Sequence, residues 1–227
     1  MVKPGHPGQL RNPGQDDRGR LASPRPQEAI AWSWGPWRVP ANGEAAVMAE
    51  PLIHIAPTSQ DPADVAAARE ASMTQYQAFD MISGRMDPEL GGSPDLLDLV
   101  GSNFYPHNQW RHHGATLPLG HHDFRPLSDL LEETSARYGR PVIIAETGAE
   151  GSARAAWLHY VCQEVAQARA HGADIGGICL YPVTSYPGWD DDRACSTGLV
   201  GPVDAKGGRP VYEPLAAELA RQAVLLG

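Results

Sequence analysis

The sequence lacks the features that mark membrane, secreted and nucleic-acid-binding proteins. No apolar run approaches the about 20 residues that a membrane-spanning helix needs, and the first ten residues lack the apolar core of a secretory signal. Lysine and arginine total 18 against 27 aspartates and glutamates, so the sequence offers no basic surface for DNA or RNA. It contains only three cysteines, at positions 162, 179 and 195, without a Cys-x-x-Cys pair for zinc. We therefore expect a cytoplasmic protein with reduced thiols that binds neither a membrane nor nucleic acid.

Composition divides the 227 residues into an irregular N-terminal leader, residues 1–45, and a regular region, residues 46–227. The leader contains seven prolines and six glycines, a composition typical of chain without regular structure. Three of the six tryptophans, Trp32, Trp34 and Trp37, also lie there, which is unusual for disordered chain. We expect the leader to precede one folded domain.

Apolar strand patterns and amphipathic helix patterns alternate four times from residue 46 onward. Because the strands are apolar on both faces, they are expected in a parallel α/β sheet covered by helices. Cys179, for example, is expected to be buried in the fourth strand. Periodicity alone does not separate a doubly wound sheet from a barrel. The strands are expected at residues 47–56, 96–105, 141–147 and 175–181, and the helices at about residues 61–82, 126–137, 152–171 and 213–225.

Glu146 is the strongest candidate for a catalytic residue. It lies at the carboxyl end of a parallel strand, where the loops of an α/β fold converge on one rim and functional residues gather. It ends the third strand after four apolar residues, 142–145, where a carboxylate is costly unless hydrogen-bond donors surround it. Two interpretations stay open. Glu146 is either a reacting carboxylate or a structural one, bound to a helix cap or to an arginine such as Arg154.

Other polar and aromatic side chains end the neighbouring strands. Asn103 and Tyr105 alternate along the second strand, so they share one face and offer an amide and a phenol to a hydroxylated ligand or to the nearby carboxylate. The fourth strand ends at Tyr181, and Trp189 and Asp190 lie in the loop that follows it. An indole suits the apolar face of a sugar ring and carboxylates suit its hydroxyls, whereas the alternative role of Trp189 is to plug the mouth of a barrel.

Taken together, these segments resemble the family 1 glycoside hydrolases, β-glucosidase-like enzymes with two catalytic glutamates on a (β/α)8 barrel. Residues 98–105, Asp-Leu-Val-Gly-Ser-Asn-Phe-Tyr, are similar to the family's sixth-strand pattern, Asp-x-x-Gly-x-Asn-Tyr-Tyr. Residues 144–148, Ile-Ala-Glu-Thr-Gly, resemble the seventh-strand segment that carries the nucleophile. The resemblance covers about residues 46–225, and segments similar to a divergent bacterial branch lie at residues 51–54, 88–92, 179–182 and 187–190.

The resemblance implies a fold, an activity and a set of site residues. The fold would be α/β, the C-terminal half of a TIM (β/α)8 barrel, with strands five to eight and their helices. The activity would be retaining hydrolysis of O-glycosyl bonds in a β-glycoside, so the partner would be a carbohydrate. Glu146 would be the nucleophile, and Tyr105 would hydrogen-bond its carboxylate. The substrate-binding residues would be Asn103, Tyr105, Tyr181, Trp189 and Asp190.

A retaining glycosidase also needs a second carboxyl, about 5–5.5 Å from the first, to protonate the leaving oxygen. In the family this glutamate follows an asparagine at the end of the fourth strand. The nearest match is Glu28, which follows Gln27. Only 21 residues separate Glu28 from Glu50, too few for the usual loop, helix and return to the fifth strand. Glu28 is therefore expected either as the acid/base or as a charged residue of the leader.

Strands one to three of such a barrel have no counterpart in the sequence, and 227 residues fall short of the about 250 of a typical TIM barrel. A half-barrel leaves two unpaired strand edges and an uncovered apolar interior. We therefore expect self-association through these edges, or a partner that supplies the rest, and little or no glycosidase activity from this chain alone. The alternative function is a non-catalytic remnant or a carbohydrate-binding half-barrel.

Neither a cofactor nor a metal is expected. Residues 148–151 open a helix but match neither a phosphate-binding loop nor a dinucleotide fingerprint. Two histidine pairs, at residues 112–113 and 121–122, and the acidic run at residues 190–192 lack the spacing of a defined coordination geometry. We interpret the histidines as solvated loop residues, and the acidic run as a loop that either contacts a sugar or is solvated.

Overall fold

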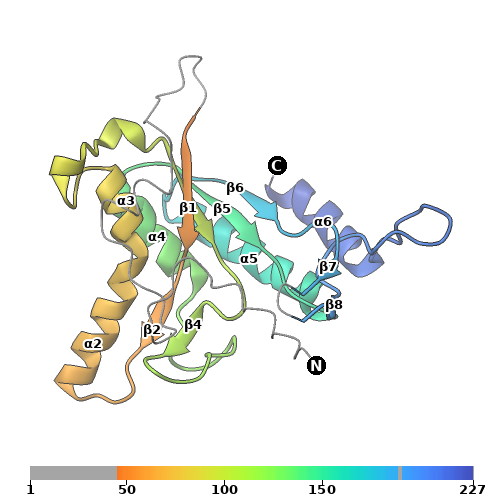
Figure 1. The fold of residues 1–227 in the computed structure, drawn as a ribbon, viewed down its shortest axis with the longest axis horizontal. Coiled ribbons are helices and arrows are strands. Elements are labelled where there is room, and N and C mark those ends of the chain that lie inside the picture. The colour runs from red at the N-terminus through yellow and green to blue at the C-terminus, as the bar shows by residue number, and fades with distance from the viewer. Residues whose placement is uncertain (1–44, 189–190, 227) are drawn as a thin grey trace, which may run out of the picture.

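The computed structural model describes residues 45–188 and 191–226, so all but the last residue of the expected leader lies outside it (Figure 1). A four-stranded sheet is built from β1 (Val47–Pro51), β3 (Leu99–Asn103), β5 (Val142–Thr147) and β6 (Ile175–Leu180). These strands pair in the order β1-β3-β5-β6, and every pairing is parallel, as the alternation of strands and helices predicted. Two pairs of short strands accompany this sheet: β2 (His54–Ala56) with β4 (Gln109–Arg111), and β7 (Tyr186–Pro187) with β8 (Ala194–Cys195).

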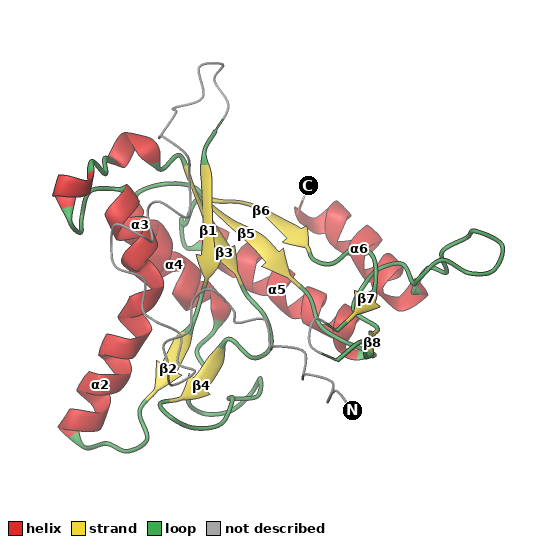
Figure 2. Cartoon of the chain, viewed as in Figure 1, coloured by secondary structure: helices red, strands yellow, loops and turns green. Residues whose placement is uncertain are grey.

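The helices are α2 (Pro62–Met73), α3 (Gln77–Ile82), α4 (Leu127–Tyr138), α5 (Ala153–Ala170) and α6 (Glu213–Leu226). In the view of Figure 2, α4 and α5 lie behind the sheet. Asp61 begins α2 by accepting a hydrogen bond from the backbone N–H of Ala63. The single helix expected at residues 61–82 is divided, because a 3-10 turn at Thr74–Tyr76 separates α2 from α3. Within the described ranges, no helix is both long enough and apolar enough to cross a membrane.

The first predicted strand is divided between two sheets. Its first half forms β1, and its second half forms β2, which turns away to pair in parallel with β4 inside the loop expected after the second strand. Asn108 holds the point of divergence, since its Nδ2 donates to the carbonyl oxygens of Leu52 at 3.0 Å and Asn103 at 2.9 Å. Pro51, at the end of β1, is the local sign of this division, because a proline within a run of strand residues interrupts the strand.

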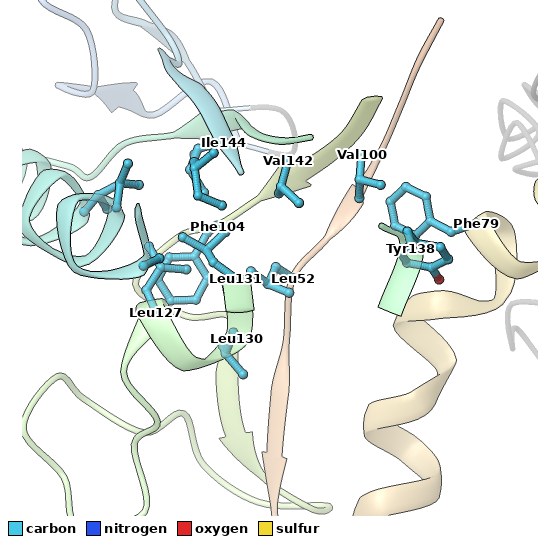
Figure 3. Close-up of a cluster of buried hydrophobic side chains, with 14 of the residues drawn as sticks. Leu52, Phe79, Val100, Phe104, Leu127, Leu130, Leu131, Tyr138, Val142 and Ile144 are labelled. Atoms are coloured by element: carbon cyan, nitrogen blue, oxygen red, sulfur yellow. The ribbon is translucent and has the colours of Figure 1, made fainter. Parts of the chain in front are cut away.

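The main hydrophobic core lies between the sheet and the helices that cover it (Figure 3). Val100, Val142 and Ile144 enter this core from the sheet and are fully buried. Phe104 joins them just after β3, and its ring stacks on Trp157 of α5 with centroids 5.6 Å apart. Burial of each such side chain contributes roughly 1.5–3 kcal/mol. The core therefore anchors the carboxyl ends of β3 and β5.

The expectation that the fourth strand is buried on both faces is wrong at Cys179, which is exposed. Ile178 and Leu180 pack into hydrophobic clusters on the face of the sheet that the helices cover. Alternation therefore puts Cys179 on the opposite face, which is called the inner face from here on. β6 is also a terminal strand, with one strand neighbour among the described residues. The inner face is consequently open at β6.

The cysteines are expected to react in an order set by burial. Cys179 is exposed, whereas Cys162 is buried and its burial raises the pKa of the thiol to about 11. At about pH 8, roughly one Cys162 thiol in a thousand is therefore the reactive thiolate. Iodoacetamide should modify Cys179 in the native chain and Cys162 only after unfolding, which peptide mass spectrometry of timed samples measures. Equal rates at the two residues would contradict this burial pattern.

Candidate active site

An irregularity near the end of β5 decides the direction in which Glu146 points. Val142 and Ile144 face the helices and are fully buried, so strict alternation would put Glu146 on that face as well. The register shifts instead: Ile144 pairs with Ser102, but Glu146 pairs with the following residue, Asn103. One residue of β5 is thus unmatched, which is a β-bulge, and bulges beside functional sites re-aim side chains. The carboxylate lies on the open, inner face of the sheet.

Glu146 contacts Tyr105, which follows the end of the neighbouring strand. The phenol of Tyr105 donates a hydrogen bond of 2.9 Å to Oε2 of Glu146. Burial raises the pKa of Tyr105, and both the hydrogen bond to Glu146 and its negative charge raise that pKa further. The phenol therefore stays protonated and remains a donor throughout the neutral pH range. The ring of His107 stacks on that of Tyr105, with centroids 5.8 Å apart.

Arg154, the alternative partner considered for Glu146, is engaged elsewhere. Its guanidinium donates to the carbonyl oxygens of Gly151 and Gly198 and lies 3.5 Å from the centre of the Tyr212 ring. In the described part of the chain, the side chain of Glu146 is therefore hydrogen-bonded to a phenol and not to an arginine.

Asn103 is the cross-strand neighbour of Glu146, because the two residues pair between β3 and β5. Its side-chain oxygen Oδ1 is buried and accepts no hydrogen bond from the residues that the structure describes. Buried acceptors are nearly always paired in folded proteins. The amide of Asn103 is thus available to a hydroxyl donor of a bound molecule.

Two further tyrosines approach the carboxylate from the segment after β6. The rings of Tyr181 and Tyr186 lie 6.4 Å apart. A hydrogen bond with Tyr186 raises the pKa of Tyr181, and the charge of Glu146 adds to this effect. Gly148 permits the close approach of this segment, since a Cβ at that position would clash with the carbonyl oxygen of Tyr181.

Of the site residues expected from the sequence, the structure brings together Asn103, Tyr105, Glu146 and Tyr181. Outside the described residues lie Glu28, Trp189 and Asp190. Tyr186 was missed by the sequence analysis. Its one signal was its place in the loop after the last strand, where functional residues of α/β folds gather.

A group with metal-ligating side chains occurs in the loop after β4. Ligand atoms of His121, His122 and Asp123 lie within 4.8 Å of one another. Arg111 binds the carboxylate of Asp123, and Nδ1 of His121 accepts a hydrogen bond from the backbone N–H of Asp123. These contacts engage Oδ2 of Asp123 and Nδ1 of His121, which are two of the possible ligand atoms of the group. Local hydrogen bonding therefore accounts for the group, and the expectation of no metal stays a prediction.

The assembled side chains can bind a hydroxylated molecule next to one oriented carboxylate. Tyr105 engages Oε2 of Glu146, while Oε1 accepts no hydrogen bond from the described residues. A cavity of about 410 Å3 adjoins the site at Tyr186 and is also lined by Arg154 and Tyr212. Among residues 45–188 and 191–226, no second carboxylate is hydrogen-bonded to this cluster.

Comparison with known proteins finds no matching family model and no matching curated protein. Solved structures of β-glycosidases do match. A family 1 β-glucosidase from Thermotoga maritima has a TM-score of 0.59 at 15% identity, covering 80% of this chain and 52% of that one. A β-glucosidase from the same organism, in complex with glucoimidazole, has a TM-score of 0.57 at 16% identity, with coverages of 79% and 50%. The β-glycosidase of the hyperthermophile Thermosphaera aggregans has a TM-score of 0.56 at 19% identity, with coverages of 79% and 43%.

These matches establish the fold and not an activity, because one fold hosts many functions. The fold is glycoside hydrolase-like, and the expected fold class, the C-terminal half of a TIM barrel, is confirmed. The chain spans about half of the length of these solved structures.

Proposed function

We propose that this chain is the nucleophile-bearing half of a family 1 retaining β-glycosidase, which hydrolyses the O-glycosyl bond of a β-glycoside. The observation that carries the proposal is the hydrogen bond of 2.9 Å from Tyr105 to Glu146, formed at the carboxyl ends of adjacent parallel strands. The β-glycosidases that share the fold support it. In this proposal the functional domain comprises residues 46–227, follows a leader at residues 1–45, and works in the cytoplasm.

Glu146 acts as the nucleophile. Its Oε1 attacks the anomeric carbon, the bond from that carbon to the glycosidic oxygen breaks, and the aglycone leaves with the bonding electrons and takes a proton from a general acid. Water then attacks the same carbon, gives its proton to the general acid, which now acts as a base, and releases Glu146 as a carboxylate. Because Tyr105 donates to Oε2, it holds the carboxylate in one orientation and leaves Oε1 for the attack.

The remaining site residues bind the sugar. The buried Oδ1 of Asn103 accepts a hydrogen bond from a sugar hydroxyl, which satisfies an acceptor that the described protein leaves unpaired. Tyr181, 39% exposed, contacts the ring from the segment after β6. Trp189 provides a stacking surface and Asp190 accepts hydroxyl donors. β-Glucosidases with this fold have been solved with glucoimidazole and with deoxynojirimycin, which supports a carbohydrate as the partner.

Glu28 is the candidate acid/base, which must lie about 5–5.5 Å from the nucleophile in a retaining enzyme. The described cluster contains one carboxylate, so protonation of an alkoxide leaving group is the step that we expect to be slow. The chain alone is therefore expected to hydrolyse ordinary alkyl β-glycosides slowly or not at all.

An activated inhibitor, dinitrophenyl 2-deoxy-2-fluoro-β-glucoside, tests the nucleophile without the acid. Dinitrophenolate leaves without a proton, and the fluorine slows hydrolysis of the glycosyl-enzyme so that it accumulates. We expect mass spectrometry to find one adduct per chain, on the peptide that contains Glu146. A folded chain without an adduct, or with an adduct elsewhere, would overturn the proposal. Binding of glucoimidazole in calorimetry without an adduct would favour a non-catalytic, carbohydrate-binding half-barrel.

We also propose that a second copy of the chain covers the open edges of the sheet. Among the described residues, β1 and β6 each pair on one side only, and unpaired edges recruit further strands. A second copy supplies a strand to both edges at once. Two helices, α2, which packs against β2, and α6, which lies near β6 (Figure 1), expose the apolar side chains Val65, Met73, Val224 and Leu225.

Replacing Cys179 by lysine is expected to weaken this self-association, because a lysine on an exposed edge strand opposes pairing. Light scattering over a concentration series should give a dimer for the wild-type chain. For C179K, the midpoint of dimer formation, which is the chain concentration at which half of the chains are dimeric, should be higher by about tenfold or more. Gln60→Lys, which adds the same charge in an exposed loop, is the control and should leave the midpoint unchanged. A monomer at every concentration, or equal shifts in both variants, would refute the dimer through these edges.

A further inference from the structure

The end of β5 carries one more residue than the strands on both sides of it. Toward β3 the register shifts between Ile144 and Glu146, and toward β6 it shifts between Ile144 and Thr147. The unmatched residue turns Glu146 to the inner face and leaves Thr147 fully buried on the helix side. A bulge interrupts the hydrogen-bond ladder, so the backbone groups beside it need other partners.

The buried hydroxyl of Thr147 supplies such a partner from the helix side. It donates to the carbonyl oxygen of Phe104 at 2.6 Å and accepts from the indole N–H of Trp157 at 2.9 Å. The backbone N–H of Phe104 donates to the carbonyl oxygen of Glu146 at 2.9 Å, so both backbone groups of Phe104 are tied to the bulged segment. The stacked rings of Trp157 and Phe104 hold the indole in place.

We infer that Thr147 and Trp157 are positioning residues, whose hydrogen bond holds the bulge that turns Glu146 toward Tyr105. Thr147 follows Glu146 directly, and Phe104 directly precedes Tyr105. Their side chains lie on the opposite face of the sheet from those of Glu146 and Tyr105. The hydrogen bond between Thr147 and Phe104 on the helix side therefore fixes the position of the Glu146 carboxylate relative to the Tyr105 phenol on the inner face. The catalytic meaning of this arrangement rests on the proposed function, whereas the positioning does not.

Position 147 requires a hydroxyl, because the group has to donate to a carbonyl and accept from an indole at the same time. Valine has the same branched shape at Cβ, but its side chain can neither donate nor accept a hydrogen bond. Thr147→Val would leave the Phe104 carbonyl and the Trp157 N–H without this partner in a buried site. The bulge then loses its support, and the contact between Glu146 and Tyr105 loosens.

NMR of the chain with 13Cζ-labelled tyrosine reports on Tyr105 directly, and Tyr105→Phe assigns its signal. In the wild-type chain we expect no titration up to about pH 11, since burial and Glu146 raise the pKa of Tyr105 above the about 10 of a free tyrosine. In Thr147→Val we expect the signal to titrate below that pH, and in Thr147→Ser to behave as in wild type. Trp157→Phe keeps an aromatic ring but removes the N–H, so it should shift the titration in the same direction by less.

Thr134→Val is the matched control. Thr134 is buried in α4, and its hydroxyl donates to the carbonyl oxygen of Leu130 at 2.8 Å, so this variant also removes a hydrogen-bonded hydroxyl from a buried site. We expect Thr134→Val to lower the melting temperature as Thr147→Val does but to leave the Tyr105 signal unchanged. If Thr147→Val lowers the melting temperature and also leaves Tyr105 unchanged, Thr147 only stabilises the fold and the inference is wrong.

The NMR test uses no sugar, so its outcome is separate from that of the proposed function. A shifted Tyr105 titration together with a wild-type chain that forms no glycosyl adduct would support the positioning role and reject the glycosidase. An adduct on Glu146 that forms at the same rate in Thr147→Val as in wild type would support the glycosidase and reject the positioning role.

Discussion

Replacing Glu146 by glutamine is expected to abolish covalent labelling by the activated 2-fluoro glycoside. Glutamine has the size of glutamate, but its amide oxygen is a far weaker nucleophile than a carboxylate oxygen. Tyr105 can still donate to that oxygen, so the site keeps its shape while it loses the attacking group. The labelling rate should fall by more than about a thousandfold, which corresponds to about 4 kcal/mol in the barrier. A time course of intact-chain masses measures it.

Glu150→Gln is the matched control for this experiment. Glu150 lies four residues beyond Glu146, is exposed, and pairs with Arg193. Because that ion pair lies in solvent, its loss should change neither the labelling rate nor, measurably, the free energy of unfolding. Undiminished labelling of the Glu146→Gln variant would assign the nucleophile to another side chain.

Replacing Asp80 by asparagine is expected to lower the free energy of unfolding by about 3 kcal/mol. Asp80 is 7% exposed, and its carboxylate accepts hydrogen bonds from Nε of Arg137 at 3.2 Å and from the phenol of Tyr138 at 2.9 Å. The pair joins α3 to α4, and the hydrogen bond to Asp80 raises the pKa of Arg137. Asparagine would leave the guanidinium without its counter-charge. Arg137 is partly exposed, which holds the loss to the lower end of the range for a broken buried pair.

Urea unfolding followed by circular dichroism measures this loss of stability. Asp174→Asn, which removes an exposed carboxylate just before β6, is the control and should change the free energy of unfolding by less than about 0.5 kcal/mol. Equal small losses in the two variants would mean that the Asp80–Arg137 pair contributes no more than an exposed ion pair.

Local patterns were sufficient to predict the order of the four strands of the main sheet and of the helices between them, because apolar periodicity is a property of neighbouring residues. They also put Glu146 and Tyr105 at the ends of adjacent strands, where the structure joins them by a hydrogen bond. They failed at Cys179, which is apolar enough for a core but lies on an edge strand whose inner face is open. The exposure of a strand depends on which other strands and helices cover it, and no local pattern contains that information.

The sequence by itself determined the α/β class and the kinds of side chain at the strand ends. Only the tertiary structure decided the face of the sheet on which Glu146 lies. Alternation counted from the buried Val142 puts Glu146 among the helices, and the bulge in β5 turns it to the open face beside Tyr105. That bulge is held by hydrogen bonds to Phe104 and Trp157 on other elements of the fold, and contacts between distant segments leave no period in the sequence.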